Sequence, residues 1–155
     1  MKATTMGVPI QILLAEDNAA DVRLVKEVLK DSKVLTEVHS VSDGVEALDF
    51  LYRRGKYAQA PRPGILFLDL NMPRKDGREV LSTMKEDPAL KDIPVVILTS
   101  SQAEEDIVRA YKHHANCYVR KPVDFQQFHD VVRRIENFWF TVVELPGVDG
   151  EPKGG

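Results

Sequence analysis

The feature that most constrains the fold is an uninterrupted apolar run that ends in a carboxylate. Residues 65–68 read Ile-Leu-Phe-Leu, and Asp69 follows them directly. An apolar run without alternation is typical of a strand that is buried on both faces, as in parallel α/β sheets. Ligands of such sheets bind beyond the carboxyl ends of the strands, so Asp69 is a candidate site residue. The alternative is that Asp69 only caps the following turn through its own backbone.

Strand-like and helix-like segments alternate along the whole chain. Strands are expected at residues 10–15, 35–41, 65–69, 93–98 and 117–119. Each is followed by a segment with apolar residues at helical spacing. Helices are expected after residue 17, from residue 43 to a stop at Gly55, and at residues 76–87, 104–114 and 124–139. This strict alternation predicts an α/β fold with a five-stranded, parallel, doubly wound sheet.

The composition is that of one globular domain, which we place at residues 8–139, with a partly disordered extension at 140–155. The chain has 155 residues, of which 43% are hydrophobic, and its net charge of -3 gives no general attraction to nucleic acid or membranes. No apolar run approaches the roughly 18 to 20 residues that span a bilayer. Cys117 is the only cysteine, which fits a reducing cytosol. We therefore expect a cytoplasmic protein with neither a nucleic-acid nor a membrane partner.

Polar side chains stand at the ends of several expected strands: Glu16-Asp17, Asp69, Thr99 and Lys121. In a parallel sheet, all of them meet at one edge. Three carboxylates in one crevice repel each other unless a cation is present, and an all-oxygen cluster suits Mg²⁺ or Mn²⁺. The lysine could simply neutralise the cluster. However, a hydroxyl, a lysine and a divalent cation are also what an incoming phosphoryl group needs, and a carboxylate can be its nucleophile.

An ordered signature runs through these strand ends, and it comprises Glu16-Asp17, Asp69, Asn71-Met72-Pro73, Asp76-Gly77, Thr99-Ser100, Tyr118 and Lys121-Pro122. In its joint spacing the chain resembles the response-regulator receiver domains, whose flavodoxin-like (CheY-like) fold accepts phosphate from a histidine kinase. The resemblance covers about residues 10–139. One departure is Glu16, which stands where the commonest receiver pattern has Asp; this lengthens one acidic arm and keeps the charge.

The resemblance implies a role for each site residue. Asp69 corresponds to the phosphoacceptor. Asp17, Asp69 and the backbone carbonyl of Asn71 correspond to direct Mg²⁺ ligands, and Glu16 to a ligand that acts through a water. Lys121 corresponds to the lysine that contacts the phosphoryl oxygens as a point charge.

The resemblance also implies a two-state switch formed by Thr99, which moves toward the phosphate, and Tyr118, which swings inward after it. The alternatives are that Thr99 only forms a turn and that Tyr118 is permanently packed.

More narrowly, the chain resembles the stand-alone receivers that partner cyanobacterial and related bacterial phytochromes. The matching segments are Asp-Gly-Arg-Glu-Val-Leu at 76–81, Asn-Cys-Tyr at 116–118, the long loop at 55–63, and Phe138-Trp139 followed by 141–146. This implies a sensor histidine kinase as partner, with a phytochrome as one candidate. We expect no output domain, so the chain would act through another protein.

The carboxyl-terminal aromatics suggest a self-association surface. Tyr118, Phe138, Trp139 and Phe140 would form an apolar patch that a monomer exposes, and we therefore expect a two-fold symmetric homodimer through the last helix. The competing account is that residues 140–145 fold back onto their own chain.

Three other functions compete with that of a phosphoacceptor. Phosphatases with an aspartyl nucleophile carry the motif Asp-x-Asp-x-Thr, in which the second Asp is the general acid. Here Asn71 takes that second position, so the general acid is missing from the motif. A flavodoxin-like binding module would place the FMN phosphate beside Glu16-Asp17, which would repel it. A receiver-like interaction module that works without phosphorylation stays open. The favoured interpretation is a phosphorelay protein that catalyses only its own phosphorylation and dephosphorylation.

Overall fold

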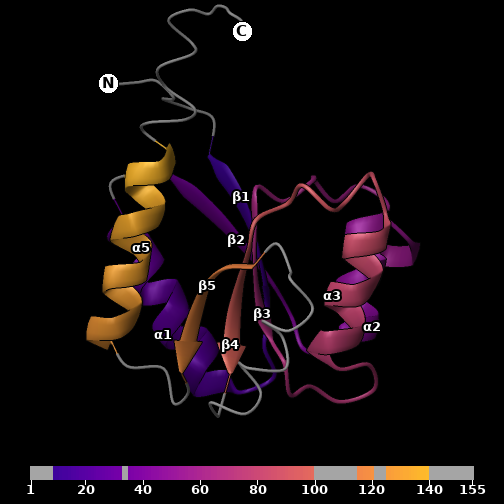
Figure 1. Ribbon diagram of the computed structural model, residues 1–155, viewed down its shortest axis with the longest axis horizontal. Coiled ribbons are helices and arrows are strands. Elements are labelled where there is room, and N and C mark those ends of the chain that lie inside the picture. Colours follow the sequence, from indigo (N-terminus) through magenta and orange to yellow (C-terminus); the bar gives the residue numbers. More distant parts are fainter. Residues whose placement is uncertain (1–8, 33–34, 100–114, 121–124, 140–155) are drawn as a thin grey trace, which may run out of the picture.

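The computed structural model describes residues 9–32, 35–99, 115–120 and 125–139. Its strands form one parallel five-stranded sheet in the order β2-β1-β3-β4-β5, as Figure 1 shows. The strands are β1 (Ile10–Ala15), β2 (Thr36–Val41), β3 (Ile65–Asp69), β4 (Val95–Thr99) and β5 (Ala115–Arg120). The predicted doubly wound α/β sheet is therefore confirmed, and the strand that ends in Asp69 lies at its centre.

Helices cover both faces of this sheet. They are α1 (Ala19–Lys30), α2 (Gly44–Tyr52), α3 (Gly77–Glu86) and α5 (Phe125–Trp139), with a short 3₁₀ helix η1 (Gly55–Tyr57). In Figure 1, α1 and α5 lie on one side of the sheet, and α2 and α3 lie on the other. The expected helix at 104–114 and the expected disordered tail lie outside the described residues. Within the described part of the chain, no helix is both long and apolar enough to cross a membrane.

The apolar run of β3 contributes to two separate cores. Leu66 and Leu68 belong to the cluster that α2 and α3 cover, whereas Ile65 and Phe67 belong to the cluster beneath α1 and α5. Phe67 meets Phe128 of α5 edge to face, with ring centroids 5.3 Å apart. Burial on both faces explains why this strand has no polar alternation.

Several element boundaries differ from the expectation, and β5 (Ala115–Arg120) is longer at both ends than the expected 117–119; two other differences have a local cause. Helix α2 ends at Tyr52 because Arg53 takes the left-handed conformation, with φ 58°, so the residue that stops the helix lies two positions before the expected Gly55. Strand β4 begins at Val95 rather than at residue 93 because the amide of Ile93 donates to the carbonyl of Leu90, which places Ile93 in a turn.

The helices that follow β1, β2 and β3 all begin at side-chain caps. Asn18, Asp43 and Asp76 each accept a hydrogen bond from the amide three residues ahead. Asp76 and Glu79 form a reciprocal capping box at the start of α3. These caps fix the loops at the carboxyl edge of the sheet.

Candidate metal centre

Three carboxylates meet at the carboxyl edge of the sheet. Glu16 and Asp17 directly follow β1, and Asp69 ends β3. The register pairs Ala15 with Leu68, so the next residue of each strand, Glu16 and Asp69, lies at the same level. One carboxylate oxygen from each of the three residues lies within 4.8 Å of the others. The structure thus brings together the acidic cluster that the sequence predicted.

Two of the three carboxylates in the cluster are buried, and the third is exposed. Asp69 is 0% exposed and Glu16 is 2% exposed, whereas Asp17 is exposed to solvent. Glu16 Oε2 accepts a hydrogen bond of 2.9 Å from the amide of Asn18, and Asp69 Oδ1 accepts one of 3.0 Å from the amide of Asn71. Asp69 therefore does cap the turn after it, but it also belongs to the cluster.

This set of donors fits a hard divalent cation. All three side chains offer carboxylate oxygens, which Mg²⁺, Mn²⁺ and Ca²⁺ prefer over nitrogen or sulfur ligands. Buried like charges at this separation oppose one another, and a bound cation removes that repulsion. The exposed side chain of Asp17 leaves the cluster open to solvent.

The other predicted site residues are placed in part. Thr99 ends β4 and is fully buried; because Leu98 pairs with Asp69, Thr99 lies one step beyond Asp69 on the neighbouring strand. Asn71 lies in the loop after β3 and is exposed. Tyr118 lies in β5, where its backbone pairs with Ile97.

The side chains of the other predicted residues are outside what the structure describes. Lys121 and Phe140 lie outside the described residues. Phe138 and Trp139 belong to α5, but their side chains, like that of Tyr118, are not described. Their assigned roles therefore stay predictions.

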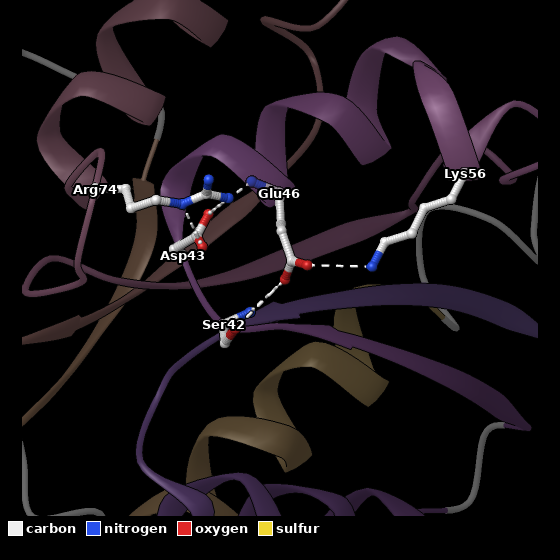
Figure 2. Close-up of polar contacts among 5 residues, drawn as sticks. All are labelled: Ser42, Asp43, Glu46, Lys56 and Arg74. Atoms are coloured by element: carbon white, nitrogen blue, oxygen red, sulfur yellow. Dashed lines mark hydrogen bonds and ion pairs between the residues drawn. The ribbon is translucent and has the colours of Figure 1, made fainter.

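An ion pair beside the site was missed by the sequence reasoning. The guanidinium of Arg74, in the loop after β3, donates to both carboxylate oxygens of Asp43 (Figure 2). Burial by itself raises the pKa of Asp43. The hydrogen bonds from Arg74 and from the amide of Glu46, together with the positive charge of Arg74, lower it by more, so the pKa of Asp43 lies below its ordinary value. Arg74 has φ 68°, a conformation that sequence patterns signal through glycine or asparagine, so nothing in the sequence marked it.

The fold and the site together define a class of protein. A doubly wound sheet of five parallel strands that gathers carboxylates at its carboxyl edge, around the end of the central strand, is the arrangement of a CheY-like receiver. Residues 12–133 match the response regulator receiver domain family, and the chain belongs to that family. It is therefore a response regulator receiver of two-component signalling.

Relatives of known name support this assignment. The chain is 48% identical over 138 residues to the response regulator Rcp1 of Synechocystis sp., covering 89% of this chain and 94% of that protein. It is similar to the crystal structure of the phosphorylated cyanobacterial phytochrome response regulator RcpA, with 48% identity, a TM-score of 0.75, and coverage of 88% and 97%. It is also similar to the Mn²⁺-bound form of Rcp1, with 47% identity, a TM-score of 0.74, and coverage of 87% and 97%. Receiver domains bind a divalent metal at this acidic pocket.

Proposed function

We propose that Asp69 accepts a phosphoryl group from the phosphohistidine of a sensor kinase, with Mg²⁺ as the metal of the acidic cluster. The observation that supports this proposal is the position of Asp69. It ends the central strand, is fully buried, and lies within 4.8 Å of the oxygens of Glu16 and Asp17. A carboxylate fixed at this place, among ligands for a cation, is suited to act as a nucleophile toward phosphorus.

Asp69 and Asn71 have different roles in the transfer. An oxygen of Asp69 forms a bond to phosphorus while the P–N bond of phosphohistidine breaks and leaves its electron pair on the imidazole. The amide of Asn71 holds the Asp69 carboxylate in orientation through its 3.0 Å hydrogen bond. When bound, a divalent cation supplies positive charge to the phosphoryl oxygens.

The remaining site roles are part of the same proposal. Asp17, Asp69 and the carbonyl of Asn71 would ligate the metal directly, and Glu16 would act through a water. Lys121 would contact the phosphoryl oxygens, and Thr99 and Tyr118 would form the switch. Thr99 suits its part because it is buried one step beyond Asp69 on the adjacent strand. These roles make the chain a phosphoacceptor that acts on itself rather than an enzyme for an external substrate.

A phytochrome is the kinase that we favour as partner. The similarity to RcpA, a cyanobacterial phytochrome response regulator, supports this choice. We further propose that the protein is cytoplasmic, as its single cysteine suggests, and forms a homodimer through α5 and the residues after it. Light scattering on the full chain and on a version truncated after Asn137 tests the dimer, because a monomeric full-length protein at micromolar concentration would contradict it.

Incubation with acetyl phosphate and Mg²⁺ tests the phosphoacceptor. We expect intact-mass spectrometry to show one added phosphoryl group, and peptide mapping to place it on Asp69. Asp69→Asn should abolish the addition, whereas Asp49→Asn, on the surface of α2, should leave it unchanged. An addition that persists in Asp69→Asn, or that needs no divalent cation, would contradict the proposal. Transfer from an autophosphorylated phytochrome kinase, with and without light, tests the partner.

A further inference from the structure

The loop between β3 and α3, residues 70–76, is fastened to the beginning of α2. This loop directly follows Asp69 and carries Asn71, so its conformation determines where the backbone of Asn71 lies beside the acidic cluster. We infer that the ion pair between Asp43 and Arg74 is a clamp that positions this loop for the metal and the phosphoryl group. The inference rests on the proposed function for its second part, the phosphoryl group.

The clamp has a directional geometry. Arg74 Nε donates to Asp43 Oδ2 at 2.9 Å, and Arg74 Nη2 donates to Asp43 Oδ1 at 3.2 Å, as Figure 2 shows. A two-point contact of this kind fixes orientation as well as distance, which a lysine cannot do. The Asp43 side chain is only 12% exposed, and its Oδ1 also accepts the amide of Glu46 at 2.8 Å as the cap of α2. Arg74 is therefore held by a partner that is itself fixed to a helix.

The backbone conformation of Arg74 also supports the clamp. Its φ of 68° is left-handed, which only Arg53 shares among the described residues other than glycine. A side chain with a Cβ is disfavoured in this conformation relative to glycine. Glycine at this position would be the relaxed choice for the backbone, so the arginine is explained by what its guanidinium holds.

Backbone contacts extend the clamp to Asp69. A Cβ on Gly44, next to Asp43, would lie 1.9 Å from the carbonyl oxygen of Lys75, so the loop lies directly against the start of α2. After the loop, Gly77 begins α3, and its amide donates to the carbonyl of Leu70 at 3.1 Å. At its other end, the Asn71 amide donates to Asp69 Oδ1. A continuous set of contacts thus connects the first residues of α2 with the predicted phosphoacceptor.

The same helix offers a matched control. Glu46, in the first turn of α2, forms an ion pair of 3.3 Å with Lys56 of η1, which Figure 2 shows beside the clamp. Lys56 does not belong to the loop that carries Asn71. Removing this second ion pair therefore perturbs α2 without releasing that loop.

The test compares Arg74→Gly with Lys56→Ala in the full chain. Arg74→Gly removes the clamp and relaxes the backbone, so we expect its melting temperature to stay level or rise. Amides of residues 70–77 should nevertheless exchange hydrogen about 10-fold faster without metal, and Mn²⁺ should bind about 10-fold more weakly by calorimetry. Arg74→Lys should lie between Arg74→Gly and wild type, because it keeps the charge but loses the two-point contact. Lys56→Ala should match wild type in exchange and in Mn²⁺ affinity.

Two results would overturn the inference: wild-type exchange and Mn²⁺ affinity in Arg74→Gly, or equal losses in Arg74→Gly and Lys56→Ala. Slower labelling by acetyl phosphate in Arg74→Gly would support the phosphoryl part. If wild type itself is not labelled on Asp69, the proposed function fails, while exchange and Mn²⁺ affinity still decide whether the clamp positions the loop.

Discussion

Gly77 and Asp69 approach each other through their backbones. A Cβ atom on Gly77 would lie 2.3 Å from the carbonyl oxygen of Asp69 and 2.8 Å from the Cα of Leu70. Helix α3 therefore begins directly against the end of β3, and only a residue without a side chain fits there. The spacing between Asp69 and the Asp76-Gly77 turn is thus a packing requirement of the site.

We predict that Gly77→Ala destabilises the protein and slows phosphorylation. Alanine would gain about 1 kcal/mol in helix propensity, but overlap with a fixed backbone costs roughly 1–3 kcal/mol, and the overlap prevails because it can be relieved only by moving Asp69 or α3. Urea unfolding should show a net loss in the free energy of unfolding, and labelling by acetyl phosphate should slow.

Gly55→Ala is the control for this substitution. Gly55 begins η1 and has φ 55° with no atom within 4 Å of an added Cβ, so alanine there introduces backbone strain outside the loop that carries Asn71. It should destabilise the protein by about 1 kcal/mol and leave labelling unchanged. If Gly77→Ala is labelled as fast as Gly55→Ala, the contact with Asp69 does not matter for the site.

The hydrogen bond between Tyr52 and Asp87 should make stability depend on pH in two ranges. Tyr52 Oη donates to Asp87 Oδ2 at 2.5 Å, which connects the end of α2 to the residue that caps α3. This bond lowers the pKa of Asp87 and raises the pKa of Tyr52. The lowered pKa means that the stabilisation is lost as pH falls below about 4, and the raised pKa means that it is lost as pH rises above about 10.

Tyr52→Phe tests this pH dependence. The variant should be less stable than wild type at neutral pH, and the difference should shrink at both extremes because the bond needs a phenol and a carboxylate. Urea unfolding at about pH 3, 7 and 10.5 measures it. In a double-mutant cycle, Tyr52→Phe and Asp87→Asn should be non-additive at neutral pH. A difference that stays constant with pH would show that the bond contributes nothing.

The fold could be predicted because its strongest signal, the apolar run of β3, is local. The run of residues 65–68 has no polar alternation, and the structure shows why: successive residues enter cores on opposite faces of the sheet. The carboxylates could be assigned to one place because strand direction alone decides that Glu16, Asp17 and Asp69 share an edge.

Other features depend on contacts that a linear pattern does not contain. Asp43 and Arg74 are 31 residues apart, and neither residue type indicates in the sequence that the two form an ion pair. The end of α2 was misplaced because a glycine normally supplies the left-handed residue, whereas here Arg53 does. The roles of Lys121 and of the carboxyl-terminal aromatics stay predictions, since the structure describes none of these side chains.

Asp17→Asn should have two effects of opposite sign on the stability of the folded protein, one without metal and one with metal. Asp17 is the exposed member of three carboxylates whose oxygens lie within 4.8 Å of one another. Without metal, its charge opposes those of Glu16 and Asp69, so replacing it with a neutral amide should raise the free energy of unfolding by about 1 kcal/mol after allowance for solvent screening. With metal, the same substitution removes a ligand and should weaken binding.

Thermal unfolding in chelator and in a titration of Mg²⁺ or Mn²⁺ separates these two effects. A cation at about 100 times its dissociation constant stabilises the folded state by about 2.7 kcal/mol, and a tenfold weaker affinity removes about 1.4 kcal/mol of that. Asp17→Asn should therefore melt above wild type in chelator and gain less from the metal. Asp92→Asn, an exposed carboxylate outside the cluster, should behave as wild type in both conditions. An Asp17→Asn variant that melts below wild type in chelator and keeps the full metal-induced shift would show that the three carboxylates neither oppose one another nor bind the cation together.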